Sequence, residues 1–72
     1  MTRFNIKPSM TAYHIMHMIR DMTAEQKLKG EKLQYALYMS ENRLKLTITE
    51  PLPTASLQCW QEFLEKDAYD QI

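Results

Sequence analysis

Residues 33–50 read LQYALYMSENRLKLTITE, in which apolar and polar side chains alternate on both sides of Glu41 and Asn42. Alternation with a period of two is typical of strands that bury one face. A two-residue turn at Glu41 and Asn42 would join the two strands, because asparagine tolerates left-handed dihedral angles. The pattern therefore predicts a β-hairpin over residues of about 33–49.

The same turn predicts which residues lie opposite each other. One face would carry the apolar pairs Met39–Leu44, Leu37–Leu46 and Tyr35–Ile48. The reverse face would carry Tyr38–Lys45, Ala36–Thr47 and Gln34–Thr49, and would be left open to water or to a partner. A slip of one residue would mix the two faces, so the pattern favours this register. A competing interpretation is a helix from Thr23 to Ser40, which would enclose Gly30 at a cost of about 1 kcal/mol relative to alanine.

A strand is predicted near the start of the chain and a helix near its end. Arg3–Lys7 alternates polar and apolar residues, which predicts a short strand with Phe4 and Ile6 facing the core. Residues of about 54–69 predict a helix that Thr54 caps. The apolar positions of this last helix are Leu57, Trp60, Leu64 and Ala68, with Phe63 beside them.

A first helix is predicted over residues of about 10–29. Ser9 or Thr11 can cap its start, and Gly30 is suited to end it. A second capping pattern at Thr23–Gln26 indicates that the helix can kink or restart there. Its apolar positions, spaced three and four apart, are Ala12, Ile15, Met16, Ile19 and Met22.

The predicted order is strand, helix, strand, strand, helix, so the fold class is α+β. A three-stranded sheet with one apolar face needs a cover, which the two helices can provide. The length of 72 residues indicates a single domain over residues 1–72.

The net charge is zero, but the charges are unevenly distributed. Residues 1–49 hold eight Lys/Arg against four Asp/Glu, and residues 50–72 hold one against five. Opposite charge at the two ends of a chain can assist encounter with a partner. A single cysteine, no apolar signal segment and no run of about 18 apolar residues predict a cytoplasmic protein without a membrane segment.

Residues with catalytic or metal-binding chemistry are sparse. His14, His17 and Asp21 share one helical face, but a structural zinc site requires four ligands and Cys59 is the only thiolate. Cys59 precedes Trp60 in a helix that must bury much of its surface, where cysteine acts as a small apolar residue. One glycine cannot form a phosphate-binding loop. We therefore expect no enzyme, cofactor, metal or small-molecule substrate.

Nucleic-acid binding is the alternative function. If the hairpin lies beside the end of the first helix, its basic residues could form one patch with Tyr38. The basic residues of this patch would be Lys27, Lys29, Lys32, Arg43 and Lys45. Sequence signatures of nucleic-acid-binding domains are absent.

Protein binding is the favoured function. Methionine is abundant, with six residues, and Met18 lies outside the predicted apolar stripe of the first helix. Flexible methionines and aromatic residues are common at protein interfaces. We therefore expect a small regulator or inhibitor, typical in size of phage or plasmid proteins, that binds a foreign protein and can homodimerise. The residues expected to bind the partner are Tyr13, Met18, Tyr38, Lys45 and an acidic last helix with Glu62, Glu65, Asp67 and Asp70.

Overall fold

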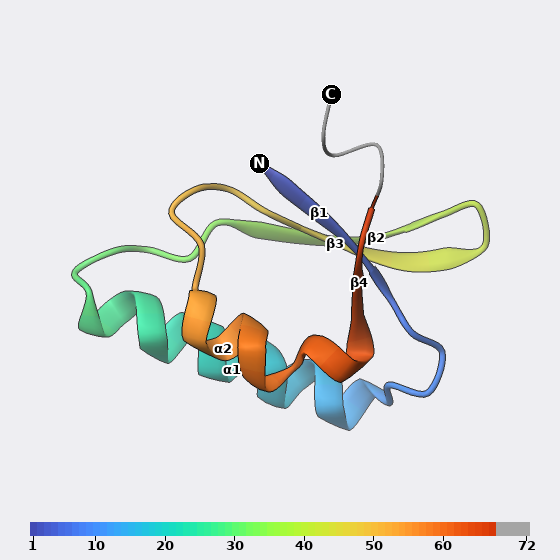
Figure 1. Cartoon of the computed structure of the whole chain (residues 1–72), viewed down its shortest axis with the longest axis horizontal. Helices are drawn as coiled ribbons and strands as arrows, with labels where there is room; N and C mark the ends of the chain where they lie inside the picture. The colour runs from blue at the N-terminus through green and yellow to red at the C-terminus, as the bar shows by residue number, and fades with distance from the viewer. Residues whose placement is uncertain (68–72) are drawn as a thin grey trace.

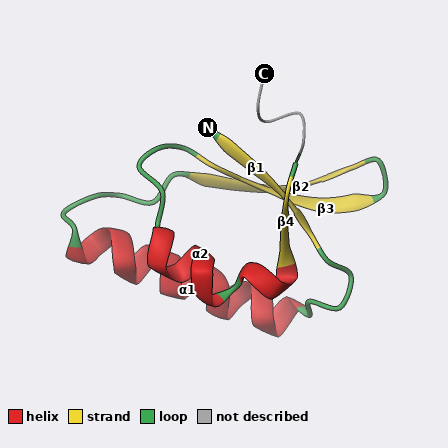
Figure 2. Ribbon diagram, in the orientation of Figure 1, coloured by secondary structure: helices red, strands yellow, loops and turns green. Residues whose placement is uncertain are grey.

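The computed structural model describes residues 1–67 as two layers, with both α-helices on one face of an antiparallel sheet (Figures 1 and 2). The elements are β1 (Thr2–Ile6), α1 (Ala12–Leu28), β2 (Tyr35–Ser40), β3 (Arg43–Ile48), α2 (Thr54–Cys59), the 3-10 helix η1 (Gln61–Phe63) and β4 (Leu64–Lys66). The strand order in the sheet is β2-β3-β1-β4. The predicted α+β class and the order of the first five elements are confirmed. The sheet has four strands and not the predicted three. The additional strand is β4, which the sequence pattern does not predict.

The hairpin of β2 and β3 has the predicted register. The strands pair as Tyr35–Ile48, Ala36–Thr47, Leu37–Leu46, Tyr38–Lys45 and Met39–Leu44. Glu41 and Asn42 have φ angles of 55° and 63°, the left-handed values of a type I′ turn, which suits the twist of the two strands. The competing helix from Thr23 to Ser40 is wrong, since α1 ends at Leu28.

Gly30 terminates α1, as the sequence predicts. Gly30 has a φ of 75° and donates its N–H to the Lys27 carbonyl at 3.0 Å. The N–H of Glu31 donates to the Gln26 carbonyl at 2.8 Å. These two bonds form a Schellman motif, which satisfies carbonyls that the last helical turn leaves without a partner.

α1 starts as predicted, but it does not kink or restart at Thr23. The Thr11 hydroxyl accepts the His14 N–H at 3.2 Å and caps the helix. At the predicted restart, the Thr23 hydroxyl instead donates to the Ile19 carbonyl at 2.7 Å within a continuous helix. Gln26 is fully buried and donates its Nε2 to the Pro51 carbonyl at 2.8 Å, so it links α1 to the segment after β3.

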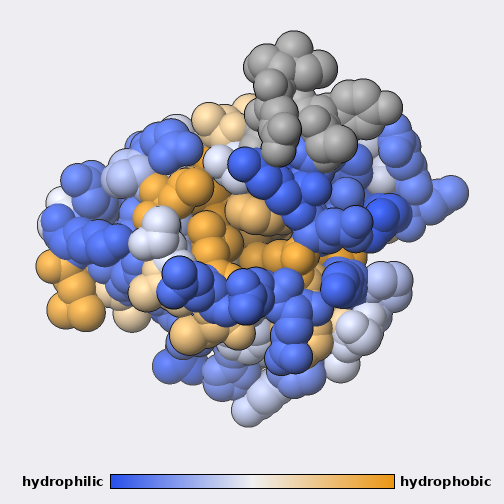
Figure 3. All heavy atoms as spheres, viewed as in Figure 1, coloured by the Kyte–Doolittle hydropathy of each residue, from blue (hydrophilic) through white to orange (hydrophobic). Residues whose placement is uncertain are grey.

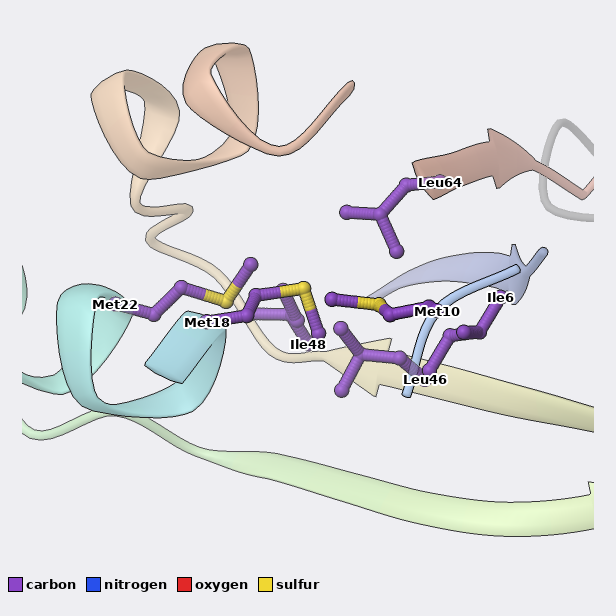
Figure 4. Packing of buried hydrophobic residues seen from close by; sticks show 7 residues of the cluster. All are labelled: Ile6, Met10, Met18, Met22, Leu46, Ile48 and Leu64. Carbon is purple, nitrogen blue, oxygen red and sulfur yellow. The ribbon is translucent and has the colours of Figure 1, made fainter. Parts of the chain in front are cut away.

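The core lies between the helices and the sheet (Figure 4). Its buried apolar residues are Ile6, Met10, Met18, Met22, Leu46, Ile48 and Leu64. The prediction is wrong for two methionines of α1: Met18 is fully buried, whereas Met16 is 57% exposed. The reason is that α2 packs along one side of α1. The buried stripe of α1 therefore faces both the sheet and α2. It is rotated by about 60° around the helix axis from the predicted stripe.

The predicted helix over residues 54–69 is correct only in its first turns, since α2 ends at Cys59. The following residues form η1 and then β4, which pairs with β1 through Ile6–Leu64, Asn5–Glu65 and Phe4–Lys66. Strand pairing there satisfies backbone groups that would otherwise remain open along β1. Ala68 lies outside the described residues.

A carboxylate of α1 caps the N-terminus of α2. The N-cap residue of α2 is Pro53, which has no side-chain hydrogen bond to offer. Glu25 accepts the Ser56 N–H at 2.7 Å and the Ala55 N–H at 3.4 Å, and its Oε2 also accepts the Lys29 ammonium at 2.9 Å. The Lys29 ammonium, assisted by the N–H groups of α2, lowers the pKa of the Glu25 carboxyl from 4.5 to about 2.

Replacing Glu25 by glutamine is expected to lower the free energy of unfolding by about 0.5–2 kcal/mol, the usual effect of losing a helix cap. Because the folded pKa is depressed, the stabilisation is complete above pH 4.5 and is lost as the pH falls towards 2. Urea unfolding at pH 7 and at pH 3 measures both effects. The matched control is Glu31→Gln, since Glu31 is exposed. Equal stability of the two variants at pH 7 would contradict the capping role.

Candidate functional site

β2 lies at one edge of the sheet, with its inner side against β3. The Thr49 N–H donates to the Gln34 carbonyl at 2.9 Å, so these two residues occupy a hydrogen-bonded position of the hairpin. Hydrogen-bonded and non-hydrogen-bonded pairs alternate along an antiparallel ladder. The backbone N–H and C=O groups of Tyr35, Leu37 and Met39 therefore point away from β3, where no strand of residues 1–67 pairs with them.

The side chains of the same three residues are also exposed. Tyr35 is 46%, Leu37 37% and Met39 66% exposed, although they share the sheet face on which the helices pack. Their neighbours in β3, Ile48 and Leu46, are fully buried, so the helices cover β3 but leave β2 open. We call the side chains and outward backbone groups of Tyr35, Leu37 and Met39 the β2 surface.

The two edges of the sheet differ in how they are protected against further strands. Natural edge strands are usually short, or carry charged residues, proline or bulges that hinder pairing with another chain. β4 fits this rule, because it has three residues, of which Glu65 and Lys66 are charged. β2 has six residues, YALYMS, with no charge and no proline. Its outer edge is therefore open to strand addition.

α1 borders the β2 surface. Thr23 and Lys27 line a hollow together with Tyr35, which shows that this side of the helix looks towards β2. Met16 precedes Thr23 by seven residues and so lies on the same side of α1.

Figure 3 shows the other side of the molecule, where apolar side chains are visible between the helices and the sheet, with polar side chains around them.

A second hollow, of about 410 Å³, brings together the residues that the sequence singles out for chemistry. It is lined by His14, Asp21, Cys59, Trp60, Glu62 and Phe63. Asp21 accepts the Trp60 Nε1–H at 2.9 Å, and the His14 ring stacks on Phe63 with centroids 5.6 Å apart. Within residues 1–67 no three His, Cys, Asp or Glu side chains are placed to hold a metal ion. The contacts of Asp21 and His14 thus join α1 to the end of α2 and to η1.

The reverse face of the sheet is less open than the sequence predicts. Lys45 and Thr47 are buried in the central strand β3. Lys45 Nζ lies 3.3 Å from Asp67 Oδ2, with 9% and 5% of the two side chains exposed. The sequence predicts both residues on surfaces that contact a partner. This placement is wrong, because Asp67 follows β4 and reaches across β1 to the lysine.

The predicted basic patch is divided between the two ends of the molecule. Lys27, Lys29 and Lys32 lie at or just beyond the C-terminal end of α1, whereas Arg43 lies at the hairpin tip, on the opposite side of Figure 1. Lys29 pairs with Glu25 at 2.9 Å, and Arg43 approaches Glu65 at 3.9 Å. With Lys45 also paired in the interior, these residues do not form one surface.

The other predicted contact residues are scattered. Tyr13 is exposed and packs edge-on against His17, and Tyr38 is half-buried in β2. Glu62 and Glu65 are exposed in η1 and β4, so the expected acidic last helix is wrong. Asp70 lies outside the described residues. The signal that points to the β2 surface is the absence of charge from residues 33–40.

Comparison of the chain with models of known protein families, with curated proteins and with solved structures finds no match. Among residues 1–67, neither helix has the length and apolar character needed to cross a membrane.

Proposed function

We propose that this chain is a small non-catalytic regulator or inhibitor that binds a protein partner through the β2 surface. The observation that carries the proposal is an uncharged edge strand of six residues with three exposed apolar side chains. An extended segment of the partner would add to the sheet beside β2.

The β2 surface offers both kinds of contact that strand addition uses. Its outward N–H and C=O groups can form main-chain hydrogen bonds with any extended segment, and these supply affinity. Its alternate side chains supply specificity, because a bound strand places every second residue on the same face of the sheet. A partner strand would therefore carry apolar residues opposite Tyr35, Leu37 and Met39, and no charge on that face.

Replacing Met39 by lysine is expected to reduce partner binding at least tenfold, because it places a charge within the apolar row of the β2 surface. Affinity capture from cells with quantitative mass spectrometry compares the variant with the wild type. The matched control is Leu28→Lys. It also replaces an exposed apolar residue by lysine, but at the end of α1 and not in β2.

The location of binding is measured by amide hydrogen exchange on the isolated complex. Exchange should slow at Tyr35, Leu37 and Met39, whose N–H groups point outward, and change little at Ala36 and Tyr38. Two results would refute the proposed function. One is that the captured proteins bind the Met39→Lys variant as well as the wild type, and the other is that hydrogen exchange at the three outward amides is unchanged in the complex.

A further inference from the structure

We infer that the occupant of the β2 surface is a second copy of this chain, paired antiparallel through β2 about a twofold axis at Leu37. The result would be a continuous eight-stranded sheet with the helices of both copies on one face. This inference rests on the proposed function, since it assigns a partner to the same edge.

The geometry of the strand selects the register. A twofold axis perpendicular to the sheet keeps each residue on its own face, so Tyr35, Leu37 and Met39 can pair only among themselves. Centring the axis on Leu37 pairs Leu37 with its own copy and Tyr35 with Met39. All three outward N–H groups of each copy then have an acceptor. A shift by two residues would leave one residue of each copy without a partner.

Side chains on both sheet faces fit this register. On the helix-bearing face every pair is apolar, and exposed apolar pairs across strands are stabilising. On the reverse face Ala36 of one copy lies opposite Tyr38 of the other, a small residue against a large one. β2 carries no charge, so no like charges meet within the pairing.

Charges at the ends of the pairing are complementary. Glu41 at the hairpin tip and Lys32 before β2 are both exposed, and within residues 1–67 neither forms an ion pair. In the register centred on Leu37, Glu41 of one copy falls opposite Leu33 and beside Lys32 of the other. The twofold axis produces this contact twice, once at each end of the paired strands.

The exposed area indicates a weak dimer. A fully exposed large side chain presents roughly 200 Å², so the exposed fractions of Tyr35, Leu37 and Met39 leave about 300 Å² per copy. Met16 and the strand backbone add to this area, but the total stays below the roughly 800 Å² per partner of a standard interface. We therefore expect dimerisation that depends on concentration between about 10 µM and about 1 mM.

Sedimentation equilibrium over that concentration range tests the inference on the full chain. The wild type should pass from monomer to dimer, and the amides of Tyr35, Leu37 and Met39 should become protected as it does so. Glu41→Lys and Lys32→Glu should each weaken the dimer by about threefold to tenfold. The double variant should recover most of the wild-type affinity, which a merely misfolded variant would not do.

Three results would overturn the inference: a monomer throughout the range, outward amides whose exchange does not depend on concentration, or a double variant as weak as the single ones. A monomeric chain whose captured proteins are lost on Met39→Lys would refute the second copy and leave the proposed function standing. A second outcome is that the chain dimerises, that the double charge variant restores the affinity, and that foreign proteins bind the Met39→Lys variant as well as the wild type. This outcome would support the second copy and refute foreign binding at this edge.

Discussion

Replacing Lys45 by methionine is expected to lower the free energy of unfolding by about 1–3 kcal/mol, because it removes the ammonium from a buried ion pair with the Asp67 carboxylate. The two side chains are 3.3 Å apart and nearly inaccessible to water. Methionine keeps the apolar stem of lysine, so the loss of packing is small. Small domains are stable by roughly 0.05–0.15 kcal/mol per residue, and the loss is therefore a large share of the total. Urea unfolding followed by the fluorescence of Trp60, the only tryptophan, measures it.

A double-mutant cycle provides the control for this prediction. Asp67→Asn removes the opposite charge while keeping the shape of the side chain. The double variant Lys45→Met with Asp67→Asn should be more stable than Lys45→Met alone, since neither side chain of the former pair then carries a charge. A Lys45→Met variant within about 0.5 kcal/mol of the wild type would show that the pair is solvated in solution.

Replacing Met18 by alanine is expected to destabilise the fold by about 2–5 kcal/mol, through lost apolar burial and the cavity that remains. Met18 is fully buried between α1 and the sheet, beside Met22 and Ile48 (Figure 4). For a domain of this size the loss corresponds to a fall in melting temperature of more than about 8 °C. Thermal unfolding followed by circular dichroism measures this change.

Met16→Ala is the matched control, because it makes the same substitution on the same helix at a residue that is 57% exposed. Its effect should stay within about 0.5 kcal/mol, as is usual for surface positions. A larger loss from Met16→Ala than from Met18→Ala would mean that α1 presents the predicted stripe to the core, contrary to the structure.

The hairpin could be predicted in detail because its information is local. Alternation with a period of two assigns each residue of β2 and β3 to a face, and a two-residue turn at Glu41 and Asn42 leaves one register that keeps the faces separate. The ends of α1 are equally local, since Thr11 and Gly30 act on backbone groups within the neighbouring turn.

The buried side of α1 could not be predicted, because apolar residues extend most of the way around this helix. Two different elements pack on it: the sheet, which buries Met18 and Met22, and α2, which is held by the bonds of Glu25 to its first N–H groups. The apolar stripe that would be buried against the sheet alone differs from the stripe that is buried when α2 also packs on α1. The buried side of α1 even includes the polar residue Gln26, whose side chain donates a hydrogen bond to the Pro51 carbonyl.

β4 and the β2 surface depend on the sheet as a whole. The segment 61–66 continues a helical pattern in sequence, but the open edge of β1 offers it backbone hydrogen bonds that a helix there would forgo. The apolar row of Tyr35, Leu37 and Met39 is typical of a buried strand face, and only the strand order places it at an edge that the helices do not reach.

By itself the sequence determined the α+β class, the hairpin register and the limits of α1, because each follows from spacing and capping within a few residues. The tertiary structure alone decided that Met18 is core, that Lys45 and Asp67 form an interior pair, and that β2 is an open edge. Those outcomes depend on contacts between segments far apart in the chain, and no local pattern contains them.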